Sequence, residues 1–98
     1  MHVVSRRYSG PGAKEAIAVG LARQHDLGAL MRSVPGFVAY TVIKVGDDAW
    51  ITATICQDKA GCDQSVQKAR EWVAANVAHT GVAAPEVTEG EVLLRITA

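Results

Sequence analysis

The sequence has few of the residues on which metal sites and disulfide frameworks depend. Among 98 residues there are only two cysteines, Cys56 and Cys62, too few for a disulfide framework and without the companions of a four-ligand zinc site. The three histidines, His2, His25 and His79, fall on three different predicted elements and lack the paired spacing of a helical metal site. No glycine-rich phosphate loop or Ser/His/Asp arrangement is recognisable. We therefore predict reduced thiols, no metal and no cofactor.

The sequence also lacks an excess of either charge and any long hydrophobic run. Ten Lys and Arg residues balance ten Asp and Glu residues, so the net charge does not favour nucleic acid or an anionic membrane as a partner. Residues 1–7 lack the apolar core of a signal peptide, and no apolar run approaches the length of a membrane span. We expect a cytoplasmic protein whose residues 1–98 form a single domain.

What the sequence does contain is an alternation of strand-like and helix-like periodicity. In chain order, the expected elements are a strand at 2–8, a helix from 13 with a break near Asp26, two strands at 37–45 and 49–57 around Gly46-Asp47-Asp48, a helix opening at 58–63, and a strand at 86–97. This βαββαβ order is that of the ferredoxin-like, α+β arrangement. It predicts a four-stranded antiparallel sheet with two helices on one face, the first strand and the second hairpin strand being central.

The strand at 37–45 has almost no polar face. One face carries Phe37, Ala39, Thr41, Ile43 and Val45, and the other carries Val38, Tyr40, Val42 and Lys44. One face of an antiparallel sheet commonly meets water, so a strand that is apolar on both sides needs a cover on both. The helices cover only one face. A homodimer through the helix-free sheet face is the simplest cover for the other.

Several features together resemble the antibiotic-biosynthesis-monooxygenase-like (ABM-like) proteins of the dimeric α+β barrel superfamily. These features are Val34-Pro35-Gly36-Phe37, Tyr40, Asp47-Asp48, Cys56-Gln57-Asp58-Lys59-Ala60 and Glu71-Trp72-Val73. The resemblance covers nearly the whole chain. It implies two sheets packed face to face in a homodimer, with a small cavity between the sheet and the helices of each subunit. The superfamily includes cofactor-independent monooxygenases, haem-degrading enzymes, other small-molecule enzymes and members with no known activity.

The resemblance and the available residue types suggest a cofactor-independent monooxygenase that acts on a phenolic or polyketide-like aromatic. The candidate catalytic residues are Tyr40, Trp72 and Arg7, and the candidate ligand-binding residues are Arg6, Phe37 and Trp50. A guanidinium suits an oxyanion, and an aromatic ring offers a flat stacking surface. Because Arg6 and Arg7 are adjacent on a strand, they point to opposite faces, and the sequence leaves open which of them faces the cavity.

Structural alternatives stand beside these roles. The arginines could form a salt bridge with Glu89 or Glu91 on the neighbouring strand, while Trp72 and Tyr40 could belong to the core. The protein would then be a non-catalytic ligand-binding or interaction domain on the same fold. A haem-degrading enzyme is a weaker alternative, because the first strand offers residues 5–7, Ser-Arg-Arg, where those enzymes use an asparagine.

Overall fold

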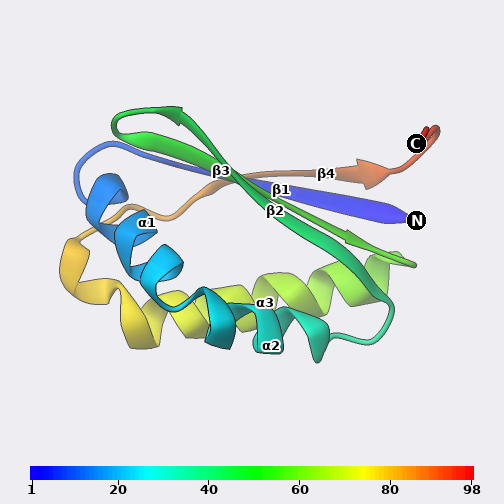
Figure 1. The fold of residues 1–98 in the computed structure, drawn as a ribbon, viewed down its shortest axis with the longest axis horizontal. Helices are drawn as coiled ribbons and strands as arrows, with labels where there is room; N and C mark the ends of the chain where they lie inside the picture. The colour runs from blue at the N-terminus through cyan, green and yellow to red at the C-terminus, as the bar shows by residue number, and fades with distance from the viewer.

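A four-stranded antiparallel sheet with all its helices on one face forms the structure (Figure 1). The structure is a computed structural model that describes residues 1–98. Its elements are β1 (His2–Ser9), α1 (Ala13–Ala22), α2 (Gln24–Arg32), β2 (Phe37–Gly46), β3 (Ala49–Cys56), α3 (Lys59–Asn76), the short 3-10 helix η1 (Ala78–Thr80) and β4 (Glu86–Glu91). None of the helices is both long and apolar enough to cross a membrane.

The strand order is β2-β3-β1-β4, and every neighbouring pair is antiparallel. The central strands are therefore β1 and β3, as the sequence predicts, and the predicted ferredoxin-like α+β fold is confirmed. Figure 1 shows the helices as one layer beneath the sheet, with α3 and the pair α1 and α2 running along it. One layer of sheet and one layer of helix leave a single interior, which lies between them.

Two element boundaries differ from the prediction by more than one residue. The first helical segment is interrupted at Arg23, which has φ −112° and ψ 25°, rather than near Asp26. The Arg23 guanidinium donates a hydrogen bond to Asn76 Oδ1 at 2.7 Å, which fastens this bend to the end of α3. The last strand ends at Glu91 rather than Thr97, because Glu91 is already opposite His2, the first residue of β1. Beyond it there is no further β1 residue to continue the ladder.

The start of α3 follows its sequence signal. Asp58 is the N-cap, and its carboxylate oxygen Oδ1 accepts a hydrogen bond from the Gly61 backbone N–H at 2.8 Å. A short acceptor side chain at this position satisfies one of the backbone donors that a helix leaves free at its first turn. This cap places α3 directly after β3, so that the helix returns across the sheet.

The strands divide their side chains between an interior face and an open face. On β1, Val4, Arg6 and Tyr8 are buried against the helices, while Arg7 between them is exposed. The interior near the start of β1 is closed by a small apolar cluster. It consists of Val4, Val34, Cys56 and Cys62, with Phe37 and Val66 packed against it. Burial and the neighbouring Cys62 raise the pKa of the Cys56 thiol to about 11, so this cysteine stays protonated near neutral pH.

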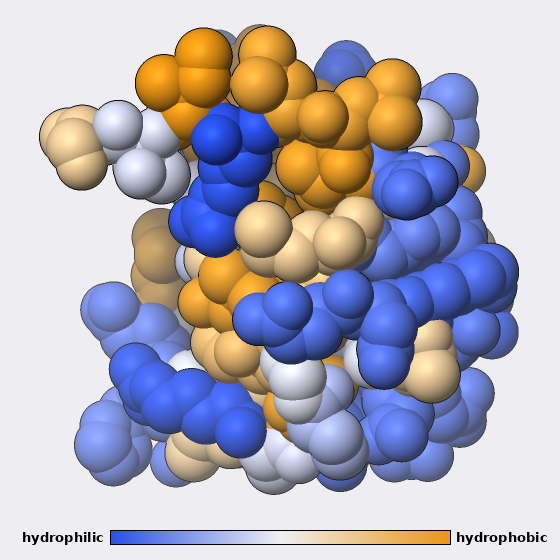
Figure 2. All heavy atoms as spheres, turned by 90° about the vertical axis from the view of Figure 1, so that its right-hand side faces the viewer, coloured by the Kyte–Doolittle hydropathy of each residue, from blue (hydrophilic) through white to orange (hydrophobic).

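The open face of the sheet carries no helix and remains rich in apolar side chains. Ile43 on β2 is 49 % exposed, and Ala53 on β3 is half-buried between Thr41 and Ser5 in the strand register. Beyond β4, Leu93, Leu94 and Ile96 are largely exposed. Figure 2 shows hydrophobic side chains gathered along the upper, sheet-side edge of the molecule, with hydrophilic ones over much of the helical layer below.

We predict that the glycine before α1 is required for space as well as for conformation. Gly10 and Gly12 both have positive φ, 84° and 86°, but only Gly12 is confined. A Cβ at Gly12 would overlap the Thr80 carbonyl oxygen and lie 2.8 Å from the Val82 backbone nitrogen, whereas a Cβ at Gly10 would meet nothing. Gly10→Ala should lower the free energy of unfolding by about 1–2 kcal/mol, the cost of the left-handed conformation. Gly12→Ala should cost a further 1–3 kcal/mol or so from overpacking, measured by urea denaturation.

Equal losses of stability in the two variants would contradict this prediction. They would mean that the loop around Thr80 and Val82 yields to the added methyl group.

Candidate functional site

A cavity of about 570 Å³ lies between the interior face of the sheet and the three α-helices. Its volume is within the range of roughly 300–1,000 Å³ that is typical of small-molecule sites. Seventeen of its 22 lining residues are hydrophobic, so an occupant would be surrounded mainly by apolar surface. Leu21, Gln24 and Arg32, on α1 and α2, line it while remaining exposed, and they mark its mouth.

Arg6 is the polar group most deeply placed in this cavity. β1 directs it to the helix side, where it is only 2 % exposed. Its Nε donates a hydrogen bond at 3.2 Å to Oγ1 of Thr52, the residue directly opposite on β3. Its Nη1 atom is buried and has no hydrogen-bond partner. A guanidinium is charged at all physiological pH values, so Arg6 holds a buried positive charge with unused donor capacity.

The salt bridge of the arginines with Glu89 or Glu91, which is the structural alternative to a functional role, is not formed. None of the four ion pairs in the structure includes Arg6 or Arg7. Glu89 lies opposite Val4 and pairs instead with the His2 ring, Nε2 to Oε1 at 2.9 Å, and with Lys59.

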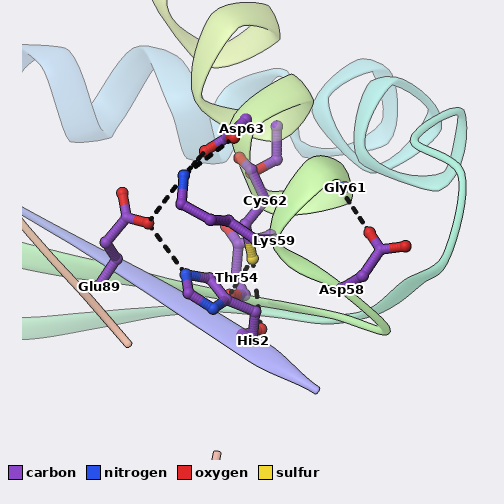
Figure 3. Close-up of polar contacts among 9 residues, drawn as sticks. His2, Thr54, Asp58, Lys59, Gly61, Cys62, Asp63 and Glu89 are labelled. Atoms are coloured by element: carbon purple, nitrogen blue, oxygen red, sulfur yellow. Dashed lines mark hydrogen bonds and ion pairs between the residues drawn. The ribbon is translucent and has the colours of Figure 1, made fainter. Parts of the chain in front are cut away.

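The carboxylate of Glu89 is held within a small polar cluster at the far end of β1 (Figure 3). Lys59 at the start of α3 is 3.6 Å from Glu89 Oε1 and 3.0 Å from Asp63 Oδ1. This cluster joins β1, β4 and α3, and it gives Glu89 two partners away from the cavity. Glu89 therefore does not form the salt bridge considered for the arginines, because its carboxylate pairs with His2 and Lys59.

Tyr40 lines the same cavity from β2. Burial raises the pKa of the Tyr40 phenol above its ordinary value of 10, although the nearby positive charge of Arg6 acts in the opposite direction. The phenol is consequently neutral at physiological pH. A neutral phenol beside a guanidinium offers a proton for hydrogen bonding and does not act as a base.

Aromatic rings form much of the remaining wall. Tyr8 and Trp50, directly opposite on β1 and β3, are stacked with ring centroids 4.2 Å apart and an interplanar angle of 10°. The Trp50 indole N–H donates to the Ala13 carbonyl oxygen at 3.0 Å, which fixes this ring against the start of α1. Trp72 lines the cavity from α3, where it is half-buried.

The structure brings together five of the six residues that the sequence singles out. Phe37, Tyr40, Trp50, Trp72 and Arg6 all line the cavity. Arg7, predicted as a catalytic residue, does not line it and is exposed on the opposite face of the sheet. Sequence reasoning missed Tyr8, although its position two residues after Arg6 places both on one face of a strand.

The cavity contains charged groups of only one sign. Arg6 and Arg32 are its two charged lining residues, and no Asp, Glu or His is among the 22. His79, on η1, lies outside the lining. The arrangement can therefore hold a flat apolar molecule, stabilise negative charge on it, and donate a hydrogen bond. It offers no carboxylate or imidazole that would accept a proton near neutral pH.

Comparisons with known proteins establish the fold. No family model matches the sequence, and no curated protein is significantly similar to it. Solved structures similar to it include three with TM-scores above 0.6.

A Nitrosomonas europaea protein of unknown function has a TM-score of 0.72 and 20% identity, over 99% of this chain and 92% of that one. SnoaB, a cofactor-independent oxygenase from Streptomyces nogalater, has a TM-score of 0.70 and 16% identity, over 99% and 97%. A Streptomyces coelicolor monooxygenase in complex with nanaomycin D has a TM-score of 0.62 and 16% identity, over 99% and 91%. Two of these three are described as an oxygenase and a monooxygenase. The predicted fold class is thereby confirmed over the whole chain.

We predict that Arg6 reduces the stability of the ligand-free protein. Replacing a buried, unpaired charge with an apolar side chain of similar length removes a desolvation cost. Arg6→Met should therefore raise the free energy of unfolding by about 1 kcal/mol or more, measured by urea denaturation at neutral pH. Arg95→Met removes an exposed arginine of the tail and serves as the matched control; it should change stability by less than about 0.5 kcal/mol.

A clear loss of stability in Arg6→Met would contradict this prediction. It would assign Arg6 to the core as a structural residue.

Proposed function

We propose that the protein binds a planar phenolic or polyketide-like aromatic molecule in this cavity and oxygenates it with molecular oxygen, without a metal or organic cofactor. The observation that carries the proposal is the apolar cavity of about 570 Å³ that Arg6, Tyr40 and Trp72 all line. The fold shared with a cofactor-independent oxygenase and with a monooxygenase supports the same chemistry. We also propose membership of the ABM-like group and a cytoplasmic location.

The reaction that this site suits is the conversion of a phenol to a quinone. The phenolic O–H and one ring C–H bond break, and the O–O bond of molecular oxygen is cleaved. One oxygen atom becomes the new carbonyl on the ring, and the other leaves as water with the two hydrogens. The aromatic substrate is oxidised and oxygen is reduced, so the balance requires no further reductant.

The roles of the residues follow from their chemistry. Arg6 stabilises the negative charge of the ionised substrate oxygen, a task for which a preorganised guanidinium in a dry site is suited. Tyr40, a neutral phenol whose pKa is raised further by burial, donates a hydrogen bond to the same region. Trp72 provides a flat surface for the rings. The apolar walls exclude water and strengthen these electrostatic interactions.

A non-catalytic ligand-binding domain remains the second candidate function. The observation that favours it is the absence of Asp, Glu and His from the cavity lining. Oxygenation of a neutral phenol begins with removal of a proton, and the site offers no ordinary general base for that step. Both candidate functions involve the same class of ligand, but only the oxygenase converts it to a product.

We also propose that the protein is a homodimer through the open face of the sheet. The support is the apolar content of that face, including Ile43 and Ala53, which no helix covers. The cavity lies on the other side of the sheet and is built within one subunit. Dimerisation would cover one face while the ligand occupies the other.

Catalysis predicts oxygen consumption in the presence of hydroxyanthrones or hydroquinones, without added metal or flavin. Tyr40→Phe should lower kcat by roughly 100-fold, because it removes one hydrogen-bond donor from the developing charge. Thr41→Val removes a hydroxyl from the adjacent, open-face position and should leave kcat unchanged. An oxygen electrode and absorbance of the quinone product measure both.

Absence of turnover on the whole substrate panel, together with saturable binding of the same compounds, would contradict catalysis. That outcome would establish the ligand-binding domain instead.

The dimer predicts a solution mass of about twice 10.4 kDa in light scattering at micromolar concentration. Ala53→Arg places a charge in the middle of the open face and should yield monomers. Ala75→Arg makes the same change on the exposed side of α3 and should leave the dimer intact. A folded wild-type monomer at these concentrations would contradict the proposal.

A further inference from the structure

We propose that the cavity binds its ligand as an aromatic oxyanion, a carboxylate or an ionised phenol, with the Arg6 guanidinium as its counter-charge. The inference rests on the proposed function, because it concerns the same cavity, and it specifies the charge state of the ligand. The independent observation is the unpartnered Nη1 of a side chain that is only 2 % exposed and lines the cavity.

The first step of the argument is the electrostatic state of the empty site. A buried charge is normally paired or fully hydrogen-bonded, because removal from water is costly. Arg6 has one hydrogen bond, from Nε to Thr52, and no ion pair. An oxyanion in the cavity would supply the negative charge that Arg6 lacks.

The second step is that no group of the protein competes for this place. The only other charged lining residue is Arg32, at the mouth, and it is also positive. The carboxylate of Glu89 is retained by His2 and Lys59 at the other end of β1 (Figure 3). The cavity is thus positive at its depth and at its entrance, which favours entry of an anion.

The third step concerns how a phenol would become reactive. Since the lining contains no Asp, Glu or His, ionisation cannot depend on a conventional protein base. A fixed positive charge stabilises the ionised form of a bound phenol and lowers its pKa. Arg6 would therefore replace a general base by selecting the substrate that is already ionised. The dependence of binding on pH would then follow the ionisation of the ligand.

The first arm of the test uses calorimetric titration with 2-naphthoate and its neutral isostere, 2-naphthamide. The wild-type protein should bind naphthoate at least about tenfold more tightly than the amide. Arg6→Gln should weaken naphthoate binding by about 10- to 100-fold, the usual effect of losing a charged hydrogen bond, with little change for the amide. Arg6→Lys, which keeps the charge, should recover part of the affinity. Arg95→Gln is the control for an exposed arginine and should change neither affinity.

The second arm uses 4-nitro-1-naphthol, whose ionised form absorbs at longer wavelength. Its apparent pKa should fall by about one unit on binding to the wild-type protein, which corresponds to tenfold stabilisation of the anion. The shift should be absent in Arg6→Gln. A preference for naphthoate without a pKa shift of the nitronaphthol identifies a carboxylate ligand. A pKa shift of the nitronaphthol without a preference for naphthoate identifies a phenolate ligand. Either result supports the proposal.

Equal affinity of the wild-type protein for naphthoate and naphthamide, with no shift for the nitronaphthol, would overturn the inference. This comparison needs no variant, so it holds even if Arg6→Gln fails to fold. Oxygen consumption with neutral phenols in that case would leave the proposed function standing while the inference fails. If no probe binds, the inference is overturned. If the protein also shows no turnover, both the inference and the proposed function are overturned.

Discussion

The interaction on which the site depends is one that the protein leaves incomplete: a buried guanidinium with a free donor. Arg6 lies on the central strand β1 and contacts a neighbouring hydroxyl, but no carboxylate balances it. Such an arrangement reduces stability, and a small domain has little stability in reserve. A structural arginine in this position would be expected to have an acidic partner. The absence of that partner connects the energetics of the fold with the chemistry of the cavity.

The space around Arg6 remains open because the surrounding helices present small residues to it. Ala16 and Gly20 on α1, Gly28 on α2 and Ala69 on α3 all line the cavity. Larger apolar side chains at these positions would fill the space and increase packing contacts. The glycines also weaken their helices by about 1 kcal/mol each relative to alanine. Both the empty volume and the buried charge thus lower stability at the same place, which is the pattern expected of a binding site.

The sequence predicts the order of the elements and the central strands, because these depend on periodicity and on local signals such as the Asp58 cap. It leaves the choice between Arg6 and Arg7 open for a geometric reason. Side chains alternate along a strand, so a shift of one residue in register reverses every assignment. The ion pairs of Glu89 could not be predicted either, because its partners His2 and Lys59 belong to two other elements. The resemblance implies a cavity between the sheet and the helices, but the size of the cavity and its full set of lining residues depend on how these layers pack, which composition does not encode.

The alternation of side chains along a strand also separates the two proposed functions of the sheet, which are ligand binding on the helix side and dimerisation on the open face. On β1 and β3, the residues that line the cavity face the helices, while the intervening positions belong to the open face. At the start of β2 a register shift between Phe37 and Ala39 interrupts this alternation, and residues 37–40 all line the cavity. Leu93, Leu94 and Ile96 lie beyond the end of β4, and their side chains are exposed in the isolated subunit. Large apolar side chains without cover are unusual in a monomer and favour association. A dimer through the open face would therefore stabilise the strands that hold Arg6, and so offset the cost of its buried charge from the far side of the same sheet.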